Sequence, residues 1–301
     1  SYSVMATNAS TACTNSMSGS ATIGINPLPN VYSVTGGGNY CSGGAGLAVG
    51  ISGSNTGINY QLYNGSTATG SPVAGTGASI NFGLQTAAGT YSVFATNSST
   101  ACTNNMSGTV AVVINPLPTV YTVTGGGSYC AGGTGVSVGL SSSNVGVNYQ
   151  LYNGAATVGS PVAGTGAAIT LANLTAAGTY TVQATNATTG CTSNMAGSAT
   201  ITINAMPTVY TVTGGGTLCS GGTGVHIGTS NSTNGINYQL YNGATAVGSP
   251  VAGTTGAGLD FGVFTTPGTY SVVATNATTG CTIAMSGSAT VIVNSLPSVF
   301  T

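Results

Sequence analysis

The amino-acid sequence predicts an all-β fold built from tandem sandwich domains. Three observations lead to this prediction: a long internal repeat, short runs in which apolar and polar residues alternate, and turn residues about every 8–12 positions. Alternation with a period of two is typical of a half-buried strand. A fixed long period indicates that one structural unit recurs along the chain.

The repeat is visible in both halves of its period. The segment VYSVTGGGNYC begins at Val31, VYTVTGGGSYC at Val120 and VYTVTGGGTLC at Val209, which gives a spacing of 89 residues. The later segment GTYxVxATN begins at Gly89, Gly178 and Gly268, with one residue inserted near 254–255. The predicted organisation is the closing strands of a truncated repeat at 1–30, complete repeats at 31–119, 120–208 and 209–298, and the start of a next repeat at 299–301. We interpret the chain as part of a longer array, or as one whose terminal strands complete domains in neighbouring subunits.

Seven strands are predicted in the middle repeat, which suits one immunoglobulin-like β-sandwich of about 89 residues. Their expected ranges are 120–124, 136–140, 148–152, 158–162, 168–171, 179–185 and 199–204. The side chains expected to face the core are Tyr180, Val182, Ala184, Ile201 and Ile203. Short proline-bearing joints (NPLP, NAMP, NSLP) follow each closing strand and favour a semi-rigid rod or fibre.

The composition excludes several functions. The chain has no Lys, Arg or Glu, one Asp (Asp260) and one His (His226). Nucleic-acid binding depends on cationic side chains, and acid–base catalysis needs positioned proton donors and acceptors. We therefore expect no enzyme, no catalytic, cofactor-binding or metal residues and no nucleic-acid partner. No apolar run approaches the roughly 18–20 residues needed to cross a bilayer as a helix, so we expect no membrane insertion either. His226 and Asp260 are interpreted as surface substitutions.

Seven cysteines occupy two positions of the repeat. The first-register cysteines follow the glycine triplet and the second-register cysteines follow the ATN segment. Pairing within repeats is predicted, with Cys102–Cys130 as an alternative across a joint, and Cys13 paired outside this sequence. The predicted bonds are Cys41–Cys102, Cys130–Cys191 and Cys219–Cys281. Disulfides indicate an oxidising, extracellular or cell-surface location.

Three further motifs each have an ordinary structural interpretation. The glycine triplets lack a following Lys and are predicted to be turns with positive φ, not phosphate-binding loops. The recurrent Tyr residues could stack on sugars but are also common strand residues: Tyr63, Tyr152 and Tyr241. The Asn-x-Ser/Thr sites are candidates for glycosylation, although Asn also favours turns: Asn8, Asn97, Asn186 and Asn276.

The C-x-G-G segment, the YQLYNG and GSPVAGTG centre and the GTYxVxATNxxTxC closing strand resemble the immunoglobulin-like repeats of giant secreted cell-surface proteins of Bacteroidota, associated with adhesion or gliding motility. This resemblance implies a secreted stalk or spacer. Our hypothesis is a structural extracellular fibre or stalk, either filament-forming or holding an adhesin away from the cell, whose partners are copies of itself. Lateral bundling should depend little on salt, because the chain is almost uncharged. The alternatives are a carbohydrate-binding module that contacts glycans or surfaces, and an ice-binding module.

Overall fold

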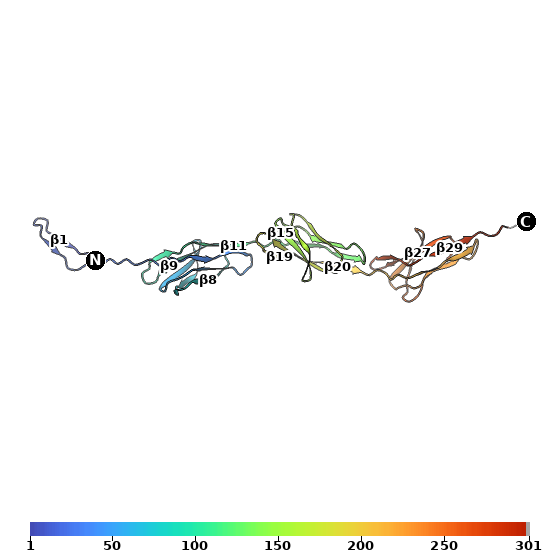
Figure 1. Cartoon of the computed structure of the whole chain (residues 1–301), viewed down its shortest axis with the longest axis horizontal. Coiled ribbons are helices and arrows are strands. Elements are labelled where there is room, and N and C mark those ends of the chain that lie inside the picture. The colour runs from blue at the N-terminus through green and yellow to red at the C-terminus, as the bar shows by residue number, and fades with distance from the viewer. Residues whose placement is uncertain (299–301) are drawn as a thin grey trace. The chain divides into compact units, whose positions relative to one another are not determined.

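Every regular element in residues 1–298 of the computed structural model is a β-strand (Figure 1). The structure describes these residues, and the predicted start of a next repeat at 299–301 lies outside them. Two compact units are present: Ser1–Leu117 with Thr188–Cys191, and Pro118–Ala187 with Thr192–Thr301. Three sandwiches of similar topology follow one another along the chain.

The first sandwich consists of two sheets. The three-stranded sheet has the order β3 (Val34–Gly36), β5 (Leu47–Ile51) and β8 (Ile80–Gln85). The second sheet has the order β4 (Gly38–Cys41), β11 (Val110–Asn115), β9 (Gly89–Asn97), β6 (Ile58–Asn64) and β7 (Thr67–Ala74), and β10 (Thr103–Asn105) also pairs with β9. Neighbouring strands are antiparallel except for β4 and β11, which are parallel. The last strand of the repeat therefore lies between an early strand and the central strand β9.

The second and third sandwiches repeat this arrangement. In the second, the smaller sheet contains β12 (Val123–Gly125), β14 (Val136–Leu140) and β17 (Ile169–Leu174), and the larger contains β13 (Gly127–Cys130), β15 (Val147–Asn153), β16 (Ala156–Ala163), β18 (Gly178–Asn186), β19 (Thr192–Asn194) and β20 (Ala199–Asn204). In the third, the smaller sheet contains β21 (Val212–Gly214), β23 (Val225–Thr229) and β26 (Asp260–Phe264), and the larger contains β22 (Gly216–Cys219), β24 (Ile236–Asn242), β25 (Thr245–Ala252), β27 (Gly268–Asn276), β28 (Thr282–Ala284) and β29 (Ala289–Asn294).

The partial repeat at the start of the chain has little structure of its own. It contains one hairpin, β1 (Met5–Thr7) with β2 (Thr14–Ser16), and a single bridge between Tyr2 and Ala21. All of residues 1–28 are exposed. These residues therefore have no hydrophobic core of their own.

Alternation along the strands places one face of each sheet in the core, as predicted. On β18, Tyr180, Val182 and Ala184 are buried, and the intervening residues lie outside. Ile201 is buried on β20, but Ile203 is 39% exposed, so its predicted inward orientation is wrong. One separate cluster of buried apolar residues fills each sandwich.

The glycine triplet carries the chain from one sheet to the other. Gly125 ends β12 and Gly127 begins β13, and the φ angles of Gly125, Gly126 and Gly127 are 88°, 79° and 130°. A Cβ atom on Gly125 would lie 2.1 Å from the carbonyl oxygen of Ser137. Both the positive φ and the close approach require glycine, which confirms the predicted structural role of the triplet.

Candidate functional site

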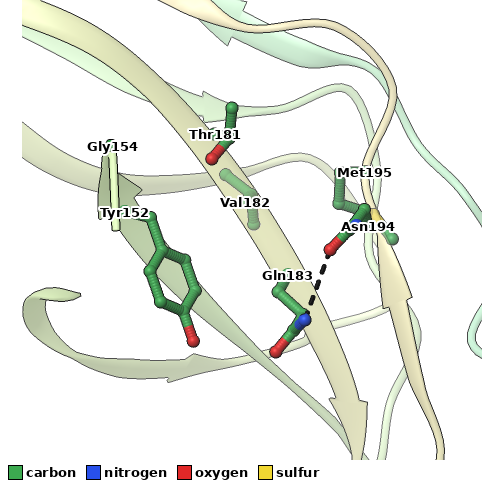
Figure 2. A pocket seen from close by; sticks show the side chains of 7 residues that line it. All are labelled: Tyr152, Gly154, Thr181, Val182, Gln183, Asn194 and Met195. Atoms are coloured by element: carbon green, nitrogen blue, oxygen red, sulfur yellow. Dashed lines mark hydrogen bonds between the residues drawn. The ribbon is translucent and has the colours of Figure 1, made fainter. Parts of the chain in front are cut away.

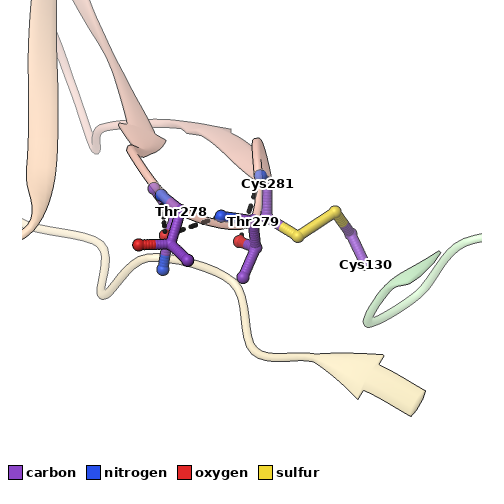
Figure 3. Close-up of a disulfide and its surroundings, with 5 residues drawn as sticks. Cys130, Thr278, Thr279 and Cys281 are labelled. Atoms are coloured by element: carbon purple, nitrogen blue, oxygen red, sulfur yellow. Dashed lines mark hydrogen bonds between the residues drawn. A yellow bond between two sulfur atoms is a disulfide. The ribbon is translucent and has the colours of Figure 1, made fainter. Parts of the chain in front are cut away.

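The second-register cysteine is presented by a tight turn after the long central strand. In the third sandwich, the Asn276 Oδ1 accepts hydrogen bonds from the backbone N–H groups of Thr278 and Thr279, at 2.9 and 3.0 Å. Figure 3 shows Thr278, Thr279 and Cys281 of this turn. The backbone N–H of Asn276 donates to the carbonyl oxygen of Cys281 at 2.8 Å. The turn thus closes on itself and directs the Cys281 side chain toward Cys130, to which it is bonded.

The first-register cysteine lies at the end of the short parallel strand. Cys41 pairs with Asn115 at the end of β11, and the N–H of Ser42 donates to the Asn115 carbonyl oxygen at 2.9 Å. Asn115 is the last residue of the closing strand, directly before the Pro-Leu-Pro joint. The first-register cysteine therefore marks the C-terminal end of its own sandwich.

The disulfides join neighbouring repeats. Cys41 is bonded to Cys191 and Cys130 to Cys281, with a Cα–Cα distance of 5.6 Å in both. Each bond connects a first-register cysteine to the second-register cysteine of the next repeat. The predicted pairs within repeats and the alternative across the joint are therefore wrong: Cys41–Cys102, Cys130–Cys191, Cys219–Cys281 and Cys102–Cys130.

Strand direction explains why pairing within a repeat fails. Val112 of β11 pairs with the first residue of β4, Gly38, and with the first residue of β9, Gly89. From this common level β4 and β9 run in opposite directions, so Cys41 lies three residues beyond Gly38 on the side away from the last residue of β9. Cys102 follows that far end, which lies eight residues from Gly89. At about 3.3 Å per residue, the two cysteines of one repeat are roughly 30 Å or more apart. A disulfide tolerates a Cα–Cα distance of only about 7 Å.

Three cysteines carry free thiols in the described part of the chain: Cys13, Cys102 and Cys219. Cys13 and Cys219 are exposed, and Cys102 is partly exposed, whereas the bonded Cys191 and Cys281 are buried. The pairing of Cys13 outside this sequence stays a prediction.

The recurrent tyrosine lies beside a shallow groove on the outer face of the larger sheet. In the second sandwich the groove has a volume of about 290 Å³, and Tyr152, Thr181, Gln183, Asn194 and Met195 contribute to its lining. Figure 2 shows Tyr152 on one side and Asn194 on the other, with the Gln183 Nε2 donating to the Asn194 Oδ1 at 3.3 Å. This volume is at the lower limit of the volumes of small-molecule binding sites.

The lining of this groove differs among repeats. The groove beside Tyr63 contains Phe94 and Asn105 at the positions of Gln183 and Asn194. The third repeat has the same tyrosine at Tyr241, but Val273 and Ala284 replace the two amides. The tyrosine recurs, but the amide groups at these two positions do not, so the three faces offer different hydrogen-bonding groups.

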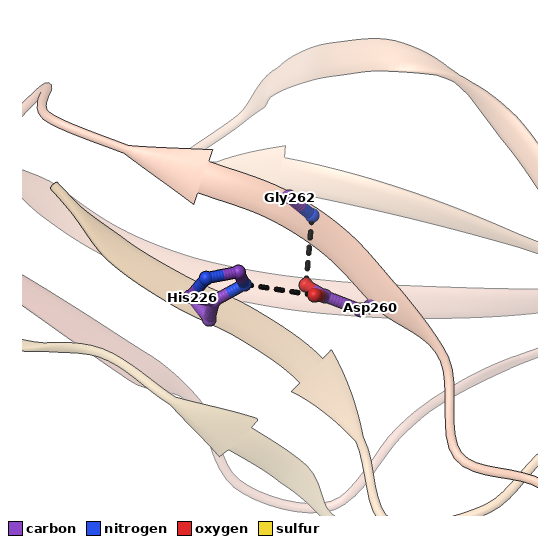
Figure 4. Close-up of polar contacts among 3 residues, drawn as sticks. All are labelled: His226, Asp260 and Gly262. Atoms are coloured by element: carbon purple, nitrogen blue, oxygen red, sulfur yellow. Dashed lines mark hydrogen bonds and ion pairs between the residues drawn. The ribbon is translucent and has the colours of Figure 1, made fainter. Parts of the chain in front are cut away.

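The His226 and Asp260 side chains are in contact through a hydrogen bond on the surface of the third sandwich (Figure 4). The His226 Nδ1 and the Asp260 Oδ2 are 2.8 Å apart, and the side chains are 69% and 58% exposed. They lie on the adjacent strands β23 and β26. Their surface location is confirmed, but the contact between them was missed. The sequence did contain a signal for this contact: the only Asp and the only His of the chain occur in the same repeat.

The asparagines of the predicted glycosylation sites lie in the turns that precede the second-register cysteines. The Oδ1 atoms of Asn8, Asn97 and Asn276 each accept two backbone hydrogen bonds within the turn that follows. Glycosylation of these residues and of Asn186 stays a prediction. The turn supplies a structural reason for Asn at three of the four positions.

Two buried tyrosines give a prediction for alkaline pH. Burial raises the pKa of the Tyr60 and Tyr91 hydroxyls above the ordinary tyrosine value. Their contribution to stability is complete below a pH of about 10 and is lost above it, because the unfolded chain releases these protons first. We expect the urea concentration at the unfolding midpoint of the first sandwich to be lower at pH 11.5 than at pH 9. Circular dichroism and hydrogen exchange of its amides measure this midpoint. An unchanged midpoint would contradict this reasoning.

Acid should have little effect on stability. Asp260 is the only side-chain carboxyl group, and hydrogen bonds from the Gly262 N–H and from His226 lower its pKa. Its contribution is present above the ordinary aspartate pKa and is lost as the pH falls through the lowered value. Because the side chain is exposed to solvent, we expect only a small shift of the urea midpoint in acid. In Asp260→Asn this carboxyl group is absent, so its contribution to the shift should disappear.

A family model described as "Ig-like domain CHU_C associated" matches residues 118–204, which contain the second sandwich. Similar solved structures include the full ectodomain (Ig1–Ig3) of mouse nectin-like molecule 4, with 12% identity, a TM-score of 0.35 and coverage of 87% of this chain and 99% of that one. The fibronectin(III)-like modules of Clostridium thermocellum CbhA show 14% identity, a TM-score of 0.33 and coverage of 58% and 95%. Murine CEACAM1b shows 12% identity, a TM-score of 0.33 and coverage of 57% and 100%. A search of curated proteins found no match. The chain contains three tandem Ig-like sandwich domains.

Proposed function

We propose that this chain is a structural segment of an extracellular stalk or fibre, in which tandem Ig-like repeats act as spacers and disulfides between repeats carry tension. The observation that supports this proposal most directly is the overlap of the two disulfide-closed loops. Residues 130–191 lie inside both loops. A stalk pulled at its ends therefore has covalent connections between repeats in addition to the backbone joints.

These bonds limit how far the chain can extend. The shortest covalent route from end to end consists of residues 1–41, the Cys41–Cys191 bond, residues 191–130 in reverse, the Cys130–Cys281 bond, and residues 281–301. This route uses less than half of the backbone. A spacer with such a limit extends less when a sandwich unfolds than a chain without these bonds would.

The bonds also support an extracellular location. Structural disulfides persist in oxidising compartments. In residues 1–298 no helix is long and apolar enough to cross a membrane. The same residues contain no cluster of three or more His, Cys, Asp or Glu side chains that could hold a metal ion.

The proposal predicts a redox-dependent length. We expect a single chain pulled between handles at Ser1 and Thr301 to reach well under half the extended length of the same chain after reduction. Single-molecule force spectroscopy measures this directly. Cys191→Ser combined with Cys281→Ser should extend fully without reductant. A Cys13→Ser variant is the matched control, because Cys13 is not bonded. Equal lengths before and after reduction would contradict a tension-bearing role for these bonds.

The finer distinction between a filament-forming protein and a spacer for an adhesin depends on contacts between chains. Near-zero net charge favours association between copies. Cryo-electron microscopy of the native material would reveal either ordered contacts between chains or isolated strands of repeats. We favour a structural role over carbohydrate binding, because the groove beside the recurrent tyrosine changes its hydrogen-bonding groups from repeat to repeat.

A further inference from the structure

The partial repeat at residues 1–30 exposes side chains that are core residues elsewhere in the chain. Residues 1–30 align with residues 90–119 at an offset of 89. Tyr2, Val4, Met17 and Ile23 are 66%, 67%, 47% and 70% exposed. Their counterparts in the first sandwich are Tyr91, Val93, Met106 and Val112, which are 1%, 2%, 6% and 1% exposed. An apolar face of this kind marks a surface that further polypeptide covers, in the same chain or in a separate one.

The sandwich topology identifies what covers it. The closing strands β9 and β11 lie between β4 on one side and β6 on the other. Both flanking strands come from the opening segment of the repeat, residues 31–88. Residues 2–8 and 21–26 therefore present two open edges, and one added strand would cover only one of them. A complete opening segment covers both edges and the apolar face.

We propose that residues 1–30 form a half-sandwich that binds the opening segment of a repeat of this same type, corresponding to residues 31–88. The opening segments of the three sandwiches do not fit this role, since β6, β15 and β24 are already paired with their own closing strands β9, β18 and β27. The partner is thus an opening segment without closing strands of its own. This proposal rests on the repeat structure and not on the proposed role as a stalk.

Cys102 lies where it could form a disulfide with the bound opening segment. Its Sγ lies 4.0 Å from the carbonyl oxygen of Asn26. Asn26 is the counterpart of Asn115, beside which Cys41 is bonded to Cys191. The Asn97 turn presents Cys102 through the same hydrogen bonds by which the Asn276 turn presents Cys281. A bound opening segment would place its first-register cysteine beside Asn26, within reach of Cys102.

The covalent step is an ordinary oxidation of two thiols. The Cys102 thiol and the thiol of the bound segment lose two protons and two electrons and form one disulfide. A low-molecular-weight disulfide such as oxidised glutathione accepts them and becomes two glutathione thiols. Cys13 is a second-register cysteine, and the bonded cysteines of this register pair with the first-register cysteine of the preceding repeat, so Cys13 should stay free in this complex.

The test uses the full chain and a recombinant fragment of residues 31–88, which contains one cysteine, Cys41. We expect a 1:1 complex by native mass spectrometry without oxidant. With oxidised glutathione, peptide mapping should find fragment Cys41 bonded to Cys102, at least tenfold over Cys13 and Cys219. Cys102→Ser should keep the complex and lose the bond.

Two variants distinguish specific binding of the fragment from nonspecific hydrophobic association. Ile23→Asp should abolish the complex, because the counterpart Val112 is a core residue. Thr22→Asp is the matched control on the neighbouring position, whose counterpart Ala111 is exposed, and it should bind normally. Neither substitution affects a buried site of the free chain.

A fusion avoids any insolubility of the fragment. A copy of residues 31–89 placed directly before Ser1 should form a fourth sandwich, protect the Ile23 amide from hydrogen exchange and bond its cysteine to Cys102. Absence of both the complex and this protection would overturn the proposal. A cross-link shared equally among the three free cysteines, or a dimer of the chain alone that blocks the fragment, would also overturn it. The length of the reduced and oxidised chain under force would be unaffected by any of these outcomes, so a failure here is distinguishable from a failure of the stalk role.

Discussion

Trypsin should cut a Thr119→Lys variant once and still leave a single covalently joined molecule. The natural chain contains no Lys or Arg, so the new Lys supplies the only tryptic site. Thr119 is exposed in the joint after the first sandwich. Because Cys41 and Cys191 lie on opposite sides of this cut and are bonded, the pieces 1–119 and 120–301 should separate on a denaturing gel only after reduction.

Cys191→Ser in the Thr119→Lys background provides the control. The two pieces should then separate without reductant, because no other disulfide crosses residue 119. Cys102→Ser in the same background should behave like the parent, since Cys102 carries a free thiol. Separation of the parent pieces without reductant would contradict the bond between repeats and favour pairing within repeats.

Replacement of Tyr149 by alanine should destabilise the second sandwich by about 3–5 kcal/mol, the usual cost of removing an aromatic side chain from a core. Tyr149 has no exposed surface, and its hydroxyl oxygen accepts a hydrogen bond from the Asn144 N–H at 2.8 Å. Tyr149→Phe keeps the ring but leaves that buried N–H without its acceptor, which costs about 1–3 kcal/mol. Hydrogen exchange of the β15 and β18 amides measures both losses within this sandwich.

Tyr152 is the matched control three residues along the same strand. It is partly exposed at the outer groove, so Tyr152→Ala should have a much smaller effect on exchange than Tyr149→Ala. Similar exchange rates in the two alanine variants would show that the inward and outward faces of β15 have been misassigned.

The local sequence pattern predicted much of the second sandwich correctly. The expected ranges 136–140 and 199–204 coincide with β14 and β20. Alternation identified the buried face of β18. Two strands were missed, β13 and β19, because they are only four and three residues long and have polar or glycine-rich sequences without clear alternation.

The missed strand β13 also accounts for the wrong disulfides. Its counterpart β4 pairs in parallel with the last strand of the repeat, and this direction places the first-register cysteine at the end opposite to the second. Alternation determines which face a residue occupies but carries no information on which strand lies next to it or in which direction. Cysteine spacing alone was equally compatible with pairs within and between repeats.

The two overlapping disulfides also bear on how well such a chain withstands proteolysis. Between the bonded pair Cys41–Cys191 and the bonded pair Cys130–Cys281 run three separate stretches of backbone, 41–130, 130–191 and 191–281. A protease must cut all three before the two bonded pairs come apart. Between residues 41 and 281 the chain therefore stays covalently continuous after its first cuts, whereas a chain without these bonds separates at the first cut.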